Sequence, residues 1–155
     1  MPSPLQKASL SELKALFATL PAPEASLRHG FFQASFVGPA FLRLSARPTL
    51  EVTGLPGWRG KKFLSADKAT NILQKGHAHV EALAMRVTQV TSMVDGKSGL
   101  ALTYPSQNGK AAPVPWRWVR DEIRALDERT LLAFTFIDLP LLRLVGIPFL
   151  LTREG

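Results

Sequence analysis

Two pairs of aromatic residues have the spacing of neighbours on one side of a β-strand. Trp116 and Trp118 are two positions apart in one expected strand, and Phe134 and Phe136 repeat that spacing in the next. Arg120 continues the tryptophan face, because side chains alternate along a strand. An interior with aromatic rings and a guanidinium would suit an apolar ligand that carries an acid group. Alternatively, the tryptophans are core residues and the arginine lies in water at a strand end.

The most distinctive string is Gly57-Trp58-Arg59-Gly60-Lys61-Lys62-Phe63. A glycine within a strand often marks a bulge or a close approach of two backbones. A flat ring beside cations could stack on an anionic ligand and pair with its charge, which makes Trp58 and Arg59 candidate ligand-binding residues. The alternative is a hairpin strand with a buried tryptophan and solvated cations.

Metal and cofactor chemistry find little support. His77, His79 and Glu81 alternate, which places three possible metal ligands on one strand face. His29 is far away in sequence, and we favour solvated histidines over a metal site. There is no glycine-rich phosphate loop and no Gly-x-Ser-x-Gly motif. The sequence therefore predicts no metal and no cofactor.

Catalysis by side chains alone is also weakly indicated. The chain has no cysteine, which excludes disulfides, thiolate metal sites and cysteine nucleophiles. Asp121, Glu122, Asp127 and Glu128 could supply an acid–base pair, but they surround a predicted hairpin turn, where solvated charge is expected. We leave open whether the protein is an enzyme and favour a non-enzymatic role.

Composition and charge limit the classes of protein to which this chain can belong. The chain has 155 residues, the size of one domain, and a net charge of +7 from 19 Lys and Arg against 12 Asp and Glu. The charge is dispersed and favours anionic partners. Glu12, Lys14 and the following prolines argue against a signal peptide. The apolar stretch 131–151 contains Asp138 and Arg143, which argues against a transmembrane segment. We expect a cytoplasmic protein and leave its oligomeric state open.

The elements that must position these residues are mostly strands. Ser9 and Glu12 form a capping box for an amphipathic helix over residues 9–20. Period-two alternation begins at Gly30, and Asp95-Gly96 is typical of a type I′ hairpin turn. The remaining expectations are strands at Thr49–Thr53, Trp58–Leu64, Trp116–Leu126, Thr130–Ile137 and Ile147–Arg153, a hairpin turn at Asp127-Glu128, and one short inner helix at Asp67–Gln74. About eight antiparallel strands over residues 30–153 predict a mostly β, lipocalin-like barrel in a single domain spanning 1–155.

The order of motifs resembles a bacterial family of unassigned function named for a Gly-X-Trp-X-Gly motif and, more loosely, lipocalin-like barrels. The string from Gly57 to Phe63 carries the resemblance, together with the segment Gly30-Phe31-Phe32-Gln33-Ala34. In that segment Phe and Ala replace the Trp and second Gly of the motif. In lipocalins a Trp near the start is packed by an Arg after the last strand, and Phe32 and Arg153 would take those places. The resemblance implies a barrel with a hydrophobic interior and implies no reaction.

Three functional hypotheses follow. The first is a barrel that binds a small apolar, anionic molecule such as a fatty acid in its interior. The second is an enzyme that acts on such a molecule in the same cavity. The third is a single-stranded nucleic-acid-binding module, with the four aromatic residues as an exposed stacking platform. The first and third differ in which way the aromatics face, and a one-residue shift in strand register exchanges inside and outside.

Overall fold

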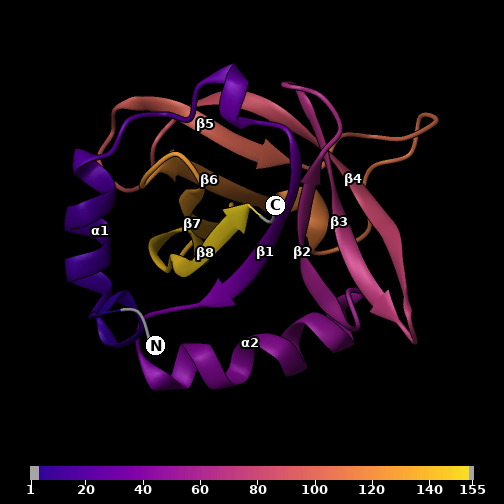
Figure 1. Ribbon diagram of the computed structural model, residues 1–155, viewed down its shortest axis with the longest axis horizontal. Helices are drawn as coiled ribbons and strands as arrows, with labels where there is room; N and C mark the ends of the chain where they lie inside the picture. Colours follow the sequence, from indigo (N-terminus) through magenta and orange to yellow (C-terminus); the bar gives the residue numbers. More distant parts are fainter. Residues whose placement is uncertain (1–3, 154–155) are drawn as a thin grey trace.

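The alternation that begins at Gly30 continues into a closed antiparallel barrel of eight strands, with two α-helices packed outside it (Figure 1). The computed structural model describes residues 4–153. The strands are β1 (Gly30–Phe36), β2 (Trp58–Phe63), β3 (Lys68–Lys75), β4 (Ala78–Thr91), β5 (Ser98–Thr103), β6 (Val119–Ala125), β7 (Thr130–Ile137) and β8 (Ile147–Arg153). The α-helices are α1 (Leu10–Thr19) and α2 (Ala40–Thr53), and short 3-10 turns lie at Pro4–Lys7, Ala25–Leu27, Trp116–Trp118 and Leu142–Leu144.

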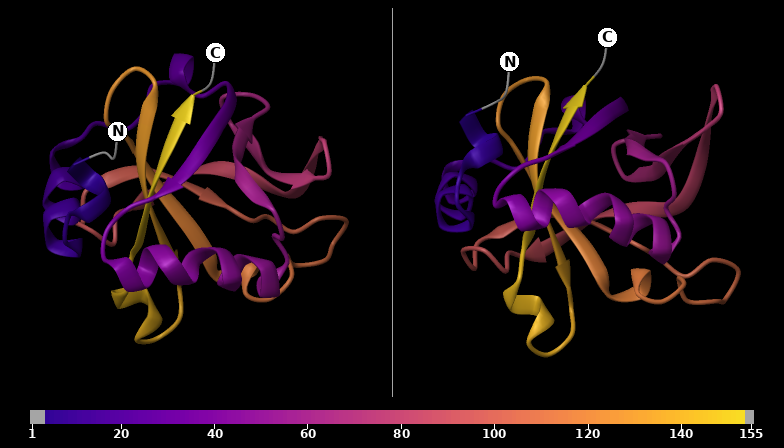
Figure 2. Two further views of the ribbon diagram at one scale, coloured as in Figure 1. Left: turned by 60° about the horizontal axis from the view of Figure 1, so that its bottom comes forward. Right: turned by 90° about the horizontal axis from the view of Figure 1, so that it is seen from below.

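Each strand pairs with the next one along the chain, and β1 also pairs with β8, which closes the barrel. The pairing of β1 with β2 extends only from Gly30 to Gln33. Beyond Gln33 the two strands separate, and the chain between them forms α2. Figure 2 shows α2 lying across this part of the barrel wall. The sequence-based expectation of an eight-stranded antiparallel barrel is confirmed.

The N-terminal helix forms as expected and covers the outside of the barrel. The side chain of Ser9 accepts from the Glu12 amide, and the Glu12 carboxylate accepts from the Ser9 amide, which completes the capping box. Leu13 and Phe17 of α1 are buried against the outer face of β7, where the Phe17 ring meets the Phe134 ring edge-on at 5.3 Å between centroids. Apolar residues on the outside of β7 are therefore explained by the helix that covers them.

Two segments have a different secondary structure from the one expected. Residues 49–53 form the end of α2 and not a strand, whereas residues 68–74 of the expected Asp67–Gln74 helix belong to β3. Pro48 and several β-branched residues disguise α2, but Gly54 with φ of 110° ends it as a left-handed cap. The strand β3 is buried on both sides from Ala69 to Leu73, so it lacks the alternation that identifies a half-buried strand.

The two glycines around Trp58 are required by close backbone approaches. Between Trp58 and Gly60 the register of β2 with β3 shifts by one residue. A Cβ on Gly60 would lie 2.0 Å from the carbonyl oxygen of Phe32, and a Cβ on Gly57 would lie 2.5 Å from that of Gln74. The glycines thus bring β2 close to both neighbours and aim Trp58 into the barrel.

The two expected hairpin turns both connect neighbouring strands. Asp127-Glu128 lies between β6 and β7, and Asp95-Gly96 lies between β4 and β5. In the second turn only Gly96 has a positive φ, of 73°. The closing bond runs from the Ser92 amide to the Lys97 carbonyl, so the connection is a four-residue loop and not the expected type I′ turn.

The end of the barrel where β8 finishes is filled by side chains. The guanidinium of Arg153 lies 5.2 Å from the centroid of the Phe32 ring and donates to the Leu27 carbonyl. Phe63, Ile123 and Leu151 belong to the same buried core. In the described residues, no helix is both long enough and apolar enough to cross a membrane.

Candidate ligand-binding cavity

The other half of the barrel interior contains a cavity of about 180 Å³. The α2 helix closes it on one side with residues that recur at helical spacing, among them Leu42, Ala46 and Leu50. Strand residues, together with Leu55, Pro115 and Trp116 from the connections, line the rest of the cavity, which is partly open to solvent. The apolar members of this wall are Phe36, Leu55, Trp58, Pro115, Trp116, Val119, Ile137, Ile147 and Phe149.

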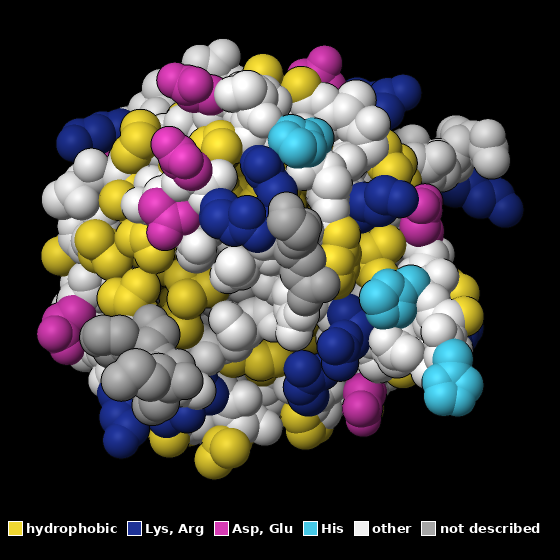
Figure 3. All heavy atoms as spheres, viewed as in Figure 1, with side chains coloured by type: hydrophobic (Ala, Val, Ile, Leu, Met, Phe, Trp, Pro, Cys, Tyr) yellow, Lys and Arg dark blue, Asp and Glu magenta, His cyan; other side chains and the backbone are white. Residues whose placement is uncertain are grey.

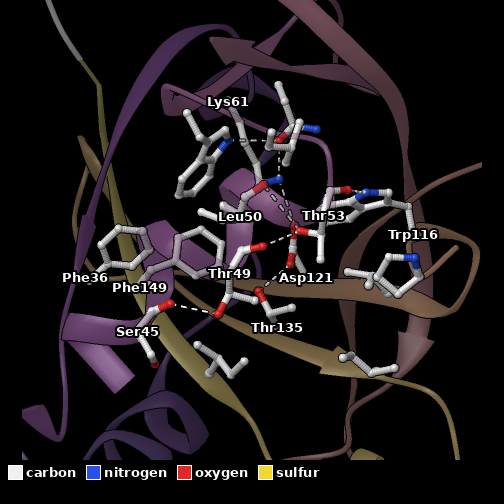
Figure 4. Close-up of a pocket in the computed structure, with 18 of the residues that line it drawn as sticks. Phe36, Ser45, Thr49, Leu50, Thr53, Lys61, Trp116, Asp121, Thr135 and Phe149 are labelled. Atoms are coloured by element: carbon white, nitrogen blue, oxygen red, sulfur yellow. Dashed lines mark hydrogen bonds and ion pairs between the residues drawn. The ribbon is translucent and has the colours of Figure 1, made fainter. Parts of the chain in front are cut away.

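A buried ion pair lies in this apolar wall. The Nζ of Lys61 is 2.9 Å from the Oδ2 of Asp121, and the two side chains are only 2% and 4% exposed. The hydroxyl of Thr135 donates to the Oδ1 of Asp121 at 2.6 Å. Figure 4 shows Lys61, Asp121 and Thr135 meeting in the cavity among the aromatic side chains. One cation and one carboxylate thus form a polar centre that is electrically neutral as a pair.

Asn71 and Tyr104 extend the polar centre. The Oδ1 of Asn71 accepts from the Nζ of Lys61 (2.9 Å) and from the Nε1 of Trp58 (3.1 Å). Its Nδ2 donates to the hydroxyl of Tyr104 and to a backbone carbonyl, each at 3.2 Å. Tyr104 therefore acts as an acceptor, and no hydrogen bond donated by its own proton is found among the described residues. That proton can serve a ligand.

The electrostatics keep Lys61 charged and Tyr104 neutral. Burial by itself lowers the pKa of Lys61, but the nearby Asp121 carboxylate and Tyr104 together outweigh burial, and the pKa lies above its ordinary value. Burial raises the pKa of Tyr104, and the neighbouring Lys61 ammonium offsets only part of this effect. At neutral pH the amine of Lys61 has no free electron pair, so it cannot act as a nucleophile.

The helical wall of the cavity carries hydroxyls that are satisfied within the helix. Thr49 donates to the Ser45 carbonyl at 2.8 Å, and Thr53 donates to the Thr49 carbonyl at 2.7 Å. Each hydroxyl oxygen keeps its capacity to accept. Trp116 anchors the end of the helix, because its Nε1 donates to the Thr53 carbonyl at 2.8 Å.

Two of the seven residues proposed from sequence line this cavity. They are Trp58, from β2, and Trp116, from the 3-10 turn that precedes β6. Trp116 and Trp118 do not belong to a strand, so their expected same-side alternation does not hold, and Trp118 does not line the cavity. Arg59 is exposed on the far side of β2.

The other three lie on the outer face of the barrel. Phe134 and Phe136 are buried under α1, and the expectation that they face the interior is wrong. Arg120 pairs with Glu122 at 2.8 Å and donates to the Thr91 carbonyl, also outside. On β6 and β7 the odd-numbered residues face inward, so these three side chains face outward. The outer face of β7 is apolar because α1 covers it, whereas the outer face of β6 carries Arg120, Glu122 and Arg124.

None of the five residues of the polar centre was proposed for ligand binding from the sequence, and one of them, Asp121, was expected with Glu122 in solvent near a turn. Asp121 and Glu122 are buried in the middle of β6 and do not lie in solvent at the turn. The signal for Asp121 was present, since it falls between Val119 and Ile123 on one strand face and interrupts an apolar series. The missed set is Lys61, Asn71, Tyr104, Asp121 and Thr135.

The candidate metal ligands remain apart from this site. His77 and His79 are exposed near the β3–β4 turn, and His79 pairs with Gln74 at 2.9 Å. Among residues 4–153 no group of three or more histidine or acidic side chains is arranged to hold a metal ion.

Comparisons with known proteins establish the fold and no more. No family model matches the chain, and no curated protein matches it. A crystal structure of a protein from Thermomonospora curvata is similar to this chain with a TM-score of 0.68 and 16% sequence identity, covering 96% of this chain and 90% of the other. At this identity the likeness concerns the arrangement of the barrel and carries no information about ligand or reaction.

Proposed function

We propose that the protein binds a small, mostly apolar and uncharged molecule in the barrel cavity, with a hydroxyl or carbonyl group placed at the Lys61–Asp121 centre. The observation that supports this most is a buried, hydrogen-bonded ion pair in the wall of an otherwise apolar cavity. Such cavities, with a few convergent polar groups, are typical of small-molecule sites. Tyr104 would donate to the ligand, and Asp121 would accept from it.

The volume limits the size of the ligand. Drug-sized molecules occupy pockets of roughly 300–1,000 Å³, whereas a cavity of about 150 Å³ accommodates benzene. At about 180 Å³, this cavity suits a ring or short chain of comparable size and is too small for a whole long-chain fatty acid.

The charge of the centre argues for a neutral ligand. The anionic ligand inferred from sequence depended on Arg59 or Arg120, and neither guanidinium reaches the cavity. Lys61 is already paired with Asp121, so a ligand carboxylate would lose its water beside an existing buried carboxylate. A hydroxyl or carbonyl group avoids this cost and still uses the same hydrogen-bonding atoms.

The nucleic-acid hypothesis loses its proposed contact surface, and the enzyme hypothesis loses only the option of an amine nucleophile at Lys61. Protonated Lys61 does not favour amine catalysis. Trp116, Phe134 and Phe136 are buried, so these residues do not form an exposed platform on which nucleic-acid bases could stack.

Ligand binding can be measured by tryptophan fluorescence and by melting temperature, because Trp58 and Trp116 line the cavity. A Trp118→Phe background removes the tryptophan outside it. We expect benzyl alcohol and cyclohexanol to quench fluorescence and raise the melting temperature, with benzoate and cyclohexanecarboxylate about tenfold weaker at neutral pH. Palmitate should bind no better than the short acids.

Matched variants on α2 test whether binding occurs in the cavity. Ala46→Phe should abolish it by filling the space, whereas Leu44→Phe, on the exposed face of the same helix, should leave it unchanged. Asp121→Asn leaves Lys61 without its counterion and should reverse the preference toward the acids. Equal binding by the Ala46→Phe variant, or acids favoured by the native chain, would refute the proposal.

A further inference from the structure

Exposed apolar side chains are concentrated at the end of the barrel that contains the cavity. We call the three longest connections there, residues 37–57, 104–118 and 138–146, the cavity-end loops. Among the described residues, nine large hydrophobic side chains are exposed, and only Leu64 lies outside these loops. The other eight are Phe41, Leu44, Val52, Val114, Leu141, Leu142, Leu144 and Val145. Exposed apolar side chains gathered in one region mark an interaction surface.

The same loops are rich in cations. They contain five Lys and Arg residues against two Asp and Glu residues. The connections at the opposite end, 64–67, 92–97 and 126–129, contain two against four. The connections at the two ends of the barrel therefore differ in charge, and the loops that expose the apolar residues are the positive ones.

The most prominent apolar loop projects from the molecule. Leu141 and Leu144 are 79% and 70% exposed in the β7–β8 connection, and Phe41 and Leu44 are exposed on the outer side of α2. Figure 2 shows the β7–β8 and β5–β6 connections projecting on the side of the molecule away from both chain termini. The face that carries the end of β8, seen in Figure 3, shows Asp and Glu side chains among Lys and Arg.

We propose that the cavity-end loops dock the protein onto the surface of an anionic lipid bilayer. Leucine and phenylalanine side chains on protruding loops enter the interface, while Arg43, Lys110 and Arg117 pair with anionic headgroups. A second copy of the chain fits less well, because two faces with the same positive excess repel each other. This inference goes beyond ligand binding in the cavity and does not depend on it.

Vesicle co-sedimentation tests the docking directly. We expect the full chain to pellet with phosphatidylcholine vesicles that contain phosphatidylserine, more weakly with phosphatidylcholine alone, and more weakly at high salt. Leu141→Ser/Leu144→Ser should reduce partitioning about tenfold, and Lys110→Glu should reduce it at least about fivefold. Leu64→Ser and Lys68→Glu, exposed at the opposite end, are the matched controls and should bind as the native chain does.

Three results would overturn the proposal: no pelleting with phosphatidylserine vesicles, equal pelleting with both vesicle types, or equal losses in the cavity-end and control variants. A dimer in analytical ultracentrifugation that Leu141→Ser/Leu144→Ser dissociates, without vesicle binding, would instead assign the face to self-association. Fluorescence titration of the same variants with benzyl alcohol measures the cavity separately. Failure of docking is thereby distinguished from failure of ligand binding.

Discussion

Removal of Lys61 alone should destabilise the protein more than removal of Lys61 and Asp121 together. In the Lys61→Met variant, the Asp121 carboxylate stays buried with only Thr135 as a hydrogen-bond partner among the described side chains. In the Lys61→Met/Asp121→Leu variant, both charges are replaced by apolar groups of similar length. The comparison isolates the cost of an uncompensated buried charge from the contribution of the pair itself.

The expected magnitudes follow from the burial of both side chains. Breaking a buried pair by removing one partner costs about 3–5 kcal/mol, whereas apolar replacement of both partners is often neutral or stabilising. We therefore expect a loss of about 3–5 kcal/mol for Lys61→Met and a smaller loss, of about 2 kcal/mol or less, for the double variant. Arg143→Met removes a cation from a pair that is more than half exposed and should cost under about 1 kcal/mol.

Urea denaturation followed by circular dichroism and fluorescence gives the free energies of unfolding. The slope with urea must stay constant across the set for the comparison to hold. The single variant Asp121→Leu completes the set. A double variant that loses as much as Lys61→Met and Asp121→Leu lose in sum would refute the reasoning, because the two residues would then act independently. A Lys61→Met loss as small as that of Arg143→Met would show that water reaches Asp121 readily.

Three further predictions concern stability. The pKa values of Lys61 and Tyr104 are raised, so the folded state holds both protons more tightly than the unfolded chain does. The stability that these protons contribute is complete below about pH 10 and is lost as the pH rises above the ordinary pKa values of 10.5 and 10.0. Urea denaturation at several pH values on both sides of pH 10 would detect this loss. Gly60→Ala should cost at least about 3 kcal/mol, because its Cβ meets the Phe32 carbonyl oxygen; a thermal midpoint close to native would show that β1 and β2 can separate. Ser9→Ala should cost about 1 kcal/mol through loss of the cap bond, and an unchanged urea midpoint would mean that α1 contributes nothing to stability.

The sequence was informative where one local rule acts alone. The Ser9 capping box, the strands from Trp58 and Thr130, and the turn at Asp127-Glu128 each follow from neighbouring residues, and each is present. The helix α2 was not predicted, because Pro48 and the β-branched residues of this segment favour other local structures. Tertiary contacts decide it: Leu42, Ala46 and Leu50 face the cavity at helical spacing.

It was harder to predict whether a strand residue faces the barrel interior or the outside. Both faces of β7 are mostly apolar and buried, one in the barrel interior and the other under α1, so hydrophobicity does not distinguish them. On β6 the outer face carries Arg120, Glu122 and Arg124, and the last two are buried in ion pairs. In the sequence, the arginine in the even-numbered series indicated a ligand site on that face. The aspartate in the odd-numbered series marks the cavity instead, and it could be chosen only after the helix that covers the other face was known.

The buried pair is difficult to explain by stability alone. Its desolvation cancels much of its attraction, and an apolar pair would fill the same wall at little or no cost in stability. The barrel already has a packed apolar core at its other end, so the fold does not need a polar centre to form. Tyr104 also lines the cavity and has a hydroxyl proton that no described residue accepts. A hydrogen-bonding ligand would use that proton and the remaining acceptor capacity of Asp121, which accounts for these polar residues better than packing does.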